Sequence, residues 1–320
     1  MAENQGAQAV HTAMGTELMH RAYGRLARRA IRAAQREALR LERLLSRFDQ
    51  RSEISRINRC AGQSCVKVSR ETFSLLKTAQ EISFLSGGAF DITIGPLVKL
   101  WDYKHALAAP DAAAIQAALS LVGFGNLALC AQSCTAGLAQ AGQVIDLGGI
   151  GKGYASDRAM AVFQRYGLQS AFTNIGGNVS TLGAKPDGTP WRVGIRHPRQ
   201  EDRILGTVGV CGQAVVTSGD YERYFTDREG NRWHHIINPA TGYPAQSGII
   251  SATVVADSAM LADALSTAIF VLGMEKGRKL LNHYPAAKAV LVDDDMKVHV
   301  SKGLRNIFTP ACGIQAEELP

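Results

Sequence analysis

The sequence predicts an α+β protein in which mixed sheets are flanked by helices. Helical and strand-like segments follow one another over its 320 residues without the regular strand–helix–strand period of a parallel α/β fold. Between Trp191 and Tyr224, strands and turns succeed one another directly, which is typical of antiparallel pairing. No internal repeat or low-complexity linker interrupts the chain. We therefore expect a single domain over residues 1–320, with a soft internal boundary near residues 140–180.

The composition is that of an ordinary globular protein, with 46% hydrophobic and 20% charged residues. No stretch approaches the ~20 consecutive apolar residues of a membrane-spanning helix. The N-terminus lacks a basic start followed by an apolar core, and no lipid-anchoring cysteine lies near Met1. These features predict a cytoplasmic protein, or a periplasmic one if a leader has been removed.

The six cysteines form no CxxC pair. Cys60 and Cys65 lie in a polar, loop-like context, and so do Cys130 and Cys134. This favours free thiols in a reducing compartment, with a disulfide or a metal site as the alternative.

The first element expected is an amphipathic helix within the segment Arg21–Arg51. Apolar residues recur there at helical spacing, and arginines fill the positions between them. A solvated outer face is the simplest interpretation of these arginines, and weak attraction to an acidic partner or a membrane surface is the alternative. No aromatic residues interleave with the arginines, so the pattern does not indicate a nucleic-acid-binding surface.

The elements that follow are marked by turn and capping residues. Ser69 is expected to cap a helix over residues 71–86, which Gly87 and Gly88 end. The remaining predicted helices cover residues 112–121, the segment after a glycine-rich turn at 148–153, and residues 258–272. The predicted strands cover residues 66–69, 144–147, 170–174 and 249–255, with a hairpin formed by 289–292 and 297–300.

A glycine-rich segment, Ile145–Ala159, is the first candidate for a functional site. Its glycines let backbone N–H groups approach a ligand closely, and Lys152 adds a cation that suits phosphate oxygens. The spacing fits neither the Walker A loop nor the GxGxxG motif. The segment therefore indicates either a site for a phosphate-bearing ligand or a tight strand-to-helix turn without one.

A second candidate lies on the predicted helix over 258–272. Asp263 and Thr267 are four residues apart, so they share one face of that helix. Both offer hard oxygen, which suits magnesium with its shell of few protein ligands, phosphates and water. A simple side-chain hydrogen bond is the alternative.

Two loop segments are the remaining candidates for a functional site. In HHIINPATGYP, a histidine in a loop shaped by Gly and Pro is a candidate general base, although a structural histidine is the alternative. In SGGAFDITIGP, Phe90 could stack on a ring and Asp91 could accept a hydrogen bond from a nucleotide hydroxyl. A buried phenylalanine is the alternative there.

Taken together, these segments resemble the ApbE family of FAD:protein FMN transferases. The resemblance extends from Ala13 to Gly273. The segments that carry it, in family order, are AMGT, LLSRFDQRSEISRIN, GGAFDITIGPLVKLW, IDLGGIGKGYASD, NIGGNVSTLG, PWRVGIRHP, VVTSGDYERYF, HHIINPATGYPA and ADALSTAIFVLG. The resemblance implies an ApbE-like fold, related to the T-fold, with an FAD site between two lobes of a single catalytic domain.

The resemblance also implies roles for individual residues. His235 would assist proton removal, and Lys152 and Asp263 would share in catalysis. The residues implied to line FAD are Met14, Phe48, Ala89, Phe90, Asp91, Asp146, Lys152 and Ile237. Those implied to hold Mg²⁺ are Gly149, Asp263, Ser266 and Thr267. Three positions depart from the pattern of relatives. Gly149, where many relatives carry Ala, Ser or Thr, offers only its backbone carbonyl. Phe48 lacks the hydroxyl of the tyrosine also found there, and Ser266 stands where some relatives carry a second acid.

The function implied is magnesium-dependent cleavage of FAD, with the FMN half attached through a phosphoester bond to a Thr or Ser of a partner flavoprotein and release of AMP. The acceptors of the family are subunits of redox complexes with a motif of the Gly-Ala-Thr type. Two alternatives stay open. One is a magnesium-dependent FAD pyrophosphatase that yields FMN and AMP, and the other is a flavin-binding protein without catalysis.

Overall fold

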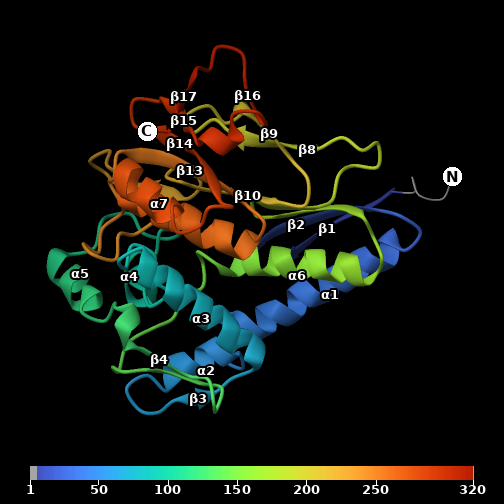
Figure 1. Cartoon of the computed structure of the whole chain (residues 1–320). Coiled ribbons are helices and arrows are strands. Elements are labelled where there is room, and N and C mark those ends of the chain that lie inside the picture. Colours follow the sequence, from blue (N-terminus) through green and yellow to red (C-terminus); the bar gives the residue numbers. More distant parts are fainter. Residues whose placement is uncertain (1–5, 320) are drawn as a thin grey trace.

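The structure is a computed structural model that describes residues 6–319. The predicted α+β class is confirmed. A nine-stranded sheet forms the centre of the larger lobe, three long helices cover one face, and a smaller sheet covers part of the other (Figure 1). A second lobe of helices and short strands, formed mainly by residues 46–150, lies beside the ends of these three helices.

The large sheet has the strand order β1-β2-β6-β7-β10-β13-β14-β15-β17, and it is antiparallel except between β15 and β17. The strands are β1 Gly6–Ala13, β2 Thr16–Tyr23, β6 Ser170–Ile175, β7 Asn178–Leu182, β10 Ala214–Gly219, β13 Ile249–Ala256, β14 Lys288–Asp293, β15 Val298–Val300 and β17 Ala316–Glu318. All eight residues of β13 are buried, since both faces of the sheet are covered at its centre.

The helices on one face follow the order of the strands beneath them. Helix α1 (Ala27–Leu45) packs on β1 and β2, α6 (Gly151–Arg165) on β6 and β7, and α7 (Ala259–Leu281) on β10 and β13. The buried side of α1 consists of alanine, isoleucine and leucine at helical spacing, as predicted. Burial of this apolar side holds the basic helix against the sheet.

On the opposite face lies a three-stranded sheet of β8 (Trp191–Arg196), β9 (Ile204–Val210) and β16 (Phe308–Pro310). Its inward valines and isoleucines pack against those of β10, β13 and β14 in one apolar cluster. Strand β8 alternates strictly between buried and exposed residues, as expected for a strand with one face on a core.

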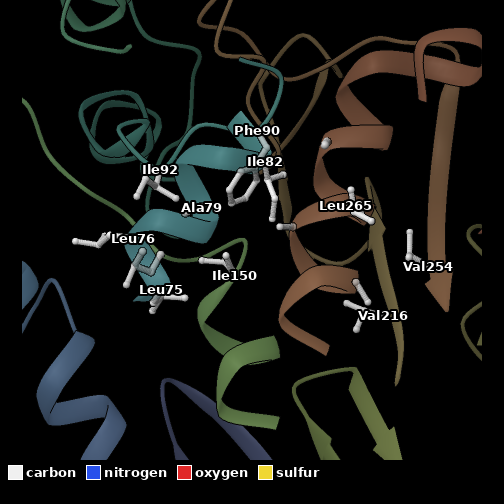
Figure 2. Packing of buried hydrophobic residues seen from close by; sticks show 14 of the residues in the cluster. Leu75, Leu76, Ala79, Ile82, Phe90, Ile92, Ile150, Val216, Val254 and Leu265 are labelled. Carbon is white, nitrogen blue, oxygen red and sulfur yellow. The ribbon is translucent and has the colours of Figure 1, made fainter. Parts of the chain in front are cut away.

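The smaller lobe contains α2 (Glu53–Arg59), α3 (Arg70–Leu85), α4 (Gly95–Trp101), α5 (Ala112–Leu119), the 3₁₀ turn η1 (Phe124–Asn126) and a sheet of β3 (Val66–Lys67), β5 (Thr135–Leu138) and β4 (Leu127–Cys130). Two further elements are the hairpin of β11 (Tyr224–Thr226) and β12 (Arg232–His234), and the 3₁₀ turn η2 (Lys302–Leu304). Apolar residues of α3, the start of α6, and α7 form one continuous core between the lobes (Figure 2).

Several predicted elements are confirmed by their caps. The Ser69 hydroxyl accepts a hydrogen bond from the Thr72 N–H at the start of α3, and the Ser258 hydroxyl does the same for Leu261 at the start of α7. Helix α7 continues beyond the predicted end at residue 272. Gly273 interrupts its helical geometry with a φ of 80° before the helix resumes.

The basic helix occupies Ala27–Leu45 within the predicted segment, and residues 21–23 before it pair with β6 as the end of β2. One predicted strand is wrong. Residues 144–147 are not a strand, although Val144 forms one isolated bridge with Ile94. The backbone N–H and C=O of Ile145 bond instead to the side-chain amide of Asn58, so they are not free to pair with a strand.

Two other features bear on the sequence predictions. All six cysteines are free thiols in the structure. Within residues 6–319, no helix is long and apolar enough to cross a membrane. The first residues of the N-terminal stretch used to predict the location, Met1 to Gln5, lie outside the described range.

A pair of histidines lies between the N-terminal hairpin and the helices. The His20 ring is fully buried, 5.2 Å from the His11 ring, with Phe163 edge-on to it. Its Nδ1 lies 2.8 Å from the Thr173 hydroxyl. Burial, reinforced by the neighbouring His11, lowers the pKa of His20 to about 4.

This burial predicts loss of stability in acid. The unfolded chain binds a proton at His20 near the ordinary histidine pKa of ~6.5, whereas the folded chain resists protonation down to about pH 4. Folding stability should therefore fall as the pH drops from 6.5 to 4, by roughly 3 kcal/mol from this group. Urea unfolding at several pH values would measure the loss. His20→Gln should weaken the pH dependence, and His105→Gln, at an exposed position, should not. Equal pH dependence in all three proteins would contradict the assignment.

Candidate active site

Two carboxylates fix the crossing of α6 and α7. Each lies on one helix and accepts hydrogen bonds from the backbone of the other. Asp263 on α7 accepts a hydrogen bond from the Gly153 N–H on α6, at 2.9 Å. Asp157 on α6 accepts hydrogen bonds from the N–H groups of Ala259 and Met260 at the start of α7. A carboxylate at a helix N-terminus is stabilised both by these donors and by the helix dipole. Each helix therefore positions the other.

Gly153 makes this crossing possible. A Cβ at this position would lie 2.2 Å from the Ala259 carbonyl oxygen and 2.8 Å from the Asp263 Cβ. The helix backbones thus approach more closely than any side chain at residue 153 would allow. The glycine that sequence analysis associated with a ligand is required here for helix packing.

Lys152 lies beside this crossing. Its Nζ is 3.5 Å from Asp263 Oδ1 and 3.2 Å from the Asn178 side-chain oxygen at the start of β7. Asp263 is 3% exposed, and its closest donor is a neutral backbone N–H, so its negative charge is only partly compensated. The lysine and the carboxylate can therefore attract ligands of opposite charge in one place.

A cluster of oxygen atoms lies on the adjacent turn of α7. The Ser218 hydroxyl on β10 is 2.9 Å from the Ser266 hydroxyl and 3.2 Å from the Thr267 hydroxyl. Ser266 and Thr267 each also donate to the Asp263 carbonyl. Ser266 is fully buried by these contacts. Ser218 was missed by the sequence analysis, although it lies in the segment VVTSGDYERYF, which signalled the family resemblance.

The glycine-rich turn meets this cluster at Gly149. A Cβ there would lie 3.3 Å from the Thr267 hydroxyl and 3.2 Å from the ring of Phe90. The Phe90 ring itself is buried between α3 and α7 (Figure 2). The structure thus brings together the predicted residues Phe90, Gly149, Lys152, Asp263 and Thr267, which are far apart in the sequence. Among the described residues, no three His, Cys, Asp or Glu side chains gather to hold a metal, so the oxygen donors here are of mixed type.

The loop after α3 is held beside the glycine-rich turn by backbone hydrogen bonds. The Asp146 N–H donates to the Ile92 carbonyl, and the Gly95 N–H donates to the Val144 carbonyl. Asp91 is buried here, and its oxygens accept hydrogen bonds from Thr93 and from the Phe124 N–H. Burial raises the pKa of Asp91. The carboxylate that sequence analysis expected to meet a nucleotide hydroxyl organises its own loop in this structure, and its contact with FAD stays a prediction.

Asp146 links the turn to the end of α1. Its Oδ2 pairs with the Arg47 Nε at 2.7 Å, and its Oδ1 accepts from the Gly148 N–H. The Arg47 guanidinium lies over the ring of Phe48, which is 79% exposed. Phe48 therefore presents a ring to solvent next to the predicted residue Asp146. Arg47 was not predicted as a site residue.

The tip of the N-terminal hairpin also borders the site. Met14 forms its turn with Gly15, and the Met14 N–H donates to Glu42 on α1. Thr16, beside this tip, contacts Gly176 in the turn between β6 and β7. That turn leads to Asn178, the partner of Lys152. The hairpin tip that contains Met14 thus adjoins the turn that leads to the lysine's partner.

The two adjacent histidines have different surroundings. His234 Nε2 lies 2.9 Å from the Ala245 carbonyl, and its ring meets Phe270 edge-on. His235 Nδ1 lies 3.1 Å from the Arg223 carbonyl, and its ring lies against Tyr103. Because a carbonyl can only accept, Nδ1 of His235 carries the proton and its Nε2 has the free lone pair.

The surroundings of His235 disfavour its protonated form. Burial, together with the positive charges of Arg223 and Lys152, lowers its pKa to about 3. This value lies far below the ordinary histidine pKa of ~6.5.

The remaining two residues implied to line FAD, Ala89 and Ile237, pack among apolar side chains. Ala89 is half-buried against the main core, next to Phe90. Ile237 is buried in a separate apolar cluster with Leu97, Trp101 and Ile115. The structure does not group Ile237 with the acidic and hydroxyl side chains, and its role as a lining residue stays a prediction.

Comparison with known proteins identifies the family. The model of the ApbE family matches residues 14–291. The chain belongs to the ApbE family. The match begins at Met14 and includes Asp263 and Thr267, so every predicted site residue lies within the part of the chain that ApbE proteins share.

Individual ApbE relatives agree with this placement. The FAD:protein FMN transferase of Klebsiella pneumoniae is 38% identical over 273 residues, which are 85% of this chain and 84% of that protein. The enzyme of the same name from Treponema pallidum is 37% identical over 312 residues, which are 91% and 85% of the two chains. The crystal structure of the ApbE protein from Thermotoga maritima superposes with a TM-score of 0.87 at 34% identity, covering 95% of this chain and 99% of that one.

The helix crossing yields a prediction with an internal control. Gly153→Ala should destabilise the protein by about 1–3 kcal/mol, because the new methyl group would collide with the α7 backbone. Gly151→Ala, two residues earlier on α6, adds a methyl group at an ordinary contact distance of 3.7 Å from Leu147. It should be neutral or stabilising, since alanine favours helix more than glycine does. Thermal unfolding of both variants provides the measurement. Equal midpoints would show that the crossing tolerates a side chain.

Proposed function

We propose that this ApbE-family chain is a magnesium-dependent FAD:protein FMN transferase. It would cleave FAD, attach FMN through a phosphoester bond to a Thr or Ser of a partner flavoprotein, and release AMP. The observation that supports this most is the convergence of Lys152, Asp263, Thr267 and the glycine-rich turn at the α6–α7 crossing. The relatives that carry this name cover most of the chain.

The donor set fits magnesium. The Asp263 carboxylate, the Thr267 hydroxyl and the Gly149 carbonyl are hard oxygen donors, and the first two lie on one face of α7. Ser266 would support this set rather than join it, because its buried hydroxyl is bonded to Ser218 and to the Asp263 carbonyl. Bound magnesium supplies neutralisation of the pyrophosphate charge and stabilisation of the AMP leaving group.

The protein's own groups would bind and orient the pyrophosphate. Lys152 would pair with its oxygens, and the Gly149 N–H in the turn before α6 would donate to them where negative charge develops. The exposed ring of Phe48 and the partly buried side chain of Met14 would contact the flavin. This arrangement favours an anionic substrate with a large planar end.

The transfer step needs a proton acceptor. The acceptor hydroxyl oxygen forms a bond to the FMN phosphorus while the bond from that phosphorus to the AMP oxygen breaks. His235 Nε2 carries the free lone pair and would take the hydroxyl proton. Because the pKa of His235 is about 3 in the free protein, the ring is neutral and able to accept at any physiological pH. The negative pyrophosphate would raise this pKa on binding.

Transfer can be tested directly by mass spectrometry. A flavoprotein subunit with a Gly-Ala-Thr-type motif should gain one FMN when incubated with the protein, FAD and Mg²⁺. Asp263→Asn should reduce transfer at least a hundredfold, since a carboxylate ligand is lost. Asp257→Asn, at an exposed position just before α7, should not. Full transfer in EDTA would contradict the metal assignment. AMP release without any labelled acceptor would favour the pyrophosphatase instead.

The base assignment predicts both a mutant effect and a pH profile. His235→Ala should slow transfer by ~10²–10⁴ while leaving FAD affinity nearly unchanged, because the group acts mainly in the transition state. For the parent, kcat/KM should show no step near pH 6.5, since His235 is already neutral far below that pH. His234→Ala should mainly lower stability, because that ring bonds the Ala245 carbonyl. A His235→Ala variant with the parent rate would rule the assignment out.

A further inference from the structure

The first strand, β1, is an open edge of the large sheet. In the described part of the chain its only neighbour is β2. The pair closes through the two-residue turn Met14–Gly15, so Ala13 and every second residue before it bond to β2. The N–H and C=O groups of the alternate residues, among them Gln8 and Val10, therefore point away from the sheet.

This edge lacks the features that usually protect one. The sequence of β1, GAQAVHTA, contains no lysine, arginine, acid or proline. Val10 is exposed, and the strand spans about 26 Å at ~3.3 Å per residue. An uncharged open edge of this length can accept an added strand from another chain.

The arginines of α1 form a row along one side of the helix. At ~100° per residue, Arg28, Arg29, Arg32, Arg36 and Arg43 fall within an arc of about 100°. All five are exposed, as is Arg25 just before the helix. None of these six pairs with an acid within residues 6–319, whereas Arg40 pairs with Glu37 and Glu71. We call the six arginines the arginine row.

The arginine row and the open edge run side by side in the same direction. At the N-terminal ends of β1 and α1, one surface depression is lined by Gly6 and Ala7 of β1 together with Arg25, Arg28, Arg29 and Arg32. At their other ends, the Met14 N–H after β1 donates to Glu42 near the end of α1. The strand edge and the positive charges thus lie together at the start of β1, and the helix that carries the arginine row follows the strand to its end.

This surface leads to the candidate active site. The turn after β1 contains Met14, and Thr16 beyond it contacts Gly176 in the turn that carries Asn178. Asn178 is the partner of Lys152. An extended chain that paired with β1 would therefore be guided toward the lysine.

We propose that β1 and the arginine row form a docking surface for an extended acidic segment of the acceptor flavoprotein. The segment adds as a strand to the β1 edge, and its carboxylates meet the arginine row. A second copy of this chain fits poorly, because pairing of β1 with itself would bring two arginine rows together. A lipid surface could meet the arginines but could not use the hydrogen-bonding edge. The inference rests on the proposed transferase function.

The test measures the KM for the acceptor subunit and the KM for FAD in the transfer assay. Arg28→Glu combined with Arg32→Glu should raise the acceptor KM at least tenfold at low salt, with kcat and the KM for FAD unchanged. The control, Lys276→Glu combined with Lys302→Glu, makes the same change in charge at exposed positions on other elements and should have no effect. Added salt should raise the parent's acceptor KM toward that of the arginine variant.

The strand edge is tested separately at Val10. Val10→Pro removes an outward N–H without removing a bond to β2, and it should raise the acceptor KM. Val10→Thr keeps the N–H and should not. Thermal unfolding confirms that both variants are folded.

Several outcomes would overturn the proposal. An unchanged acceptor KM in the arginine and proline variants does so while leaving the transferase function intact. In a second outcome, the parent sediments with phosphatidylserine vesicles, and the arginine variant does not although its acceptor KM is unchanged. The arginine row would then bind a lipid surface. In a third outcome, the parent is a dimer that Val10→Pro dissociates without a change in the acceptor KM. The β1 edge would then pair with a second copy of this chain. A parent that transfers no FMN refutes the proposed function, and this docking role with it.

Discussion

The close crossing of α6 and α7 is the constraint on which the rest of the site depends. Gly153 leaves no side chain between the helices, so a carboxylate from each reaches the backbone N–H groups of the other. Buried bonds of this kind are strong because one partner is charged and solvent is excluded. The lysine one residue before this glycine and the oxygen atoms of α7 are consequently held in a fixed relation, without any contribution from flexible loops.

Positive charge governs the chemistry around this crossing. Burial, with smaller contributions from the positive charges of Arg223 and Lys152, holds His235 in its neutral form, and Arg47 pairs with Asp146 beside the glycine-rich turn. The same charges that would attract a pyrophosphate thus help to keep the histidine able to accept a proton. Asp263 is the exception, a buried carboxylate with an incomplete set of partners, and such a group is suited to a cation.

Motifs and caps made much of this arrangement predictable from sequence. Ser69 and Ser258 mark the starts of two helices by a local rule, and the order of the motifs indicated the family. The N-terminal hairpin was not predicted, because its turn uses Met14 in a left-handed conformation rather than the usual Asn-Gly. Asp157, Asn178 and Ser218 were not predicted either, since their roles arise from contacts between distant segments. The low pKa of His235 likewise comes from burial, which a local pattern does not reveal.

The strand order of the large sheet has a consequence for synthesis of the protein. The hairpin of β1 and β2 leaves the ribosome before the rest of the sheet, yet the outer edge of β2 must wait for β6, which follows the whole of the smaller lobe. At typical rates of chain elongation that delay is on the order of ten seconds. During this time two unpaired strand edges are exposed on the nascent chain, and the long-range pairing that closes the sheet is intrinsically slow. The arginines that follow the hairpin in the sequence would then act as gatekeepers, since their repulsion opposes aggregation of neighbouring nascent chains.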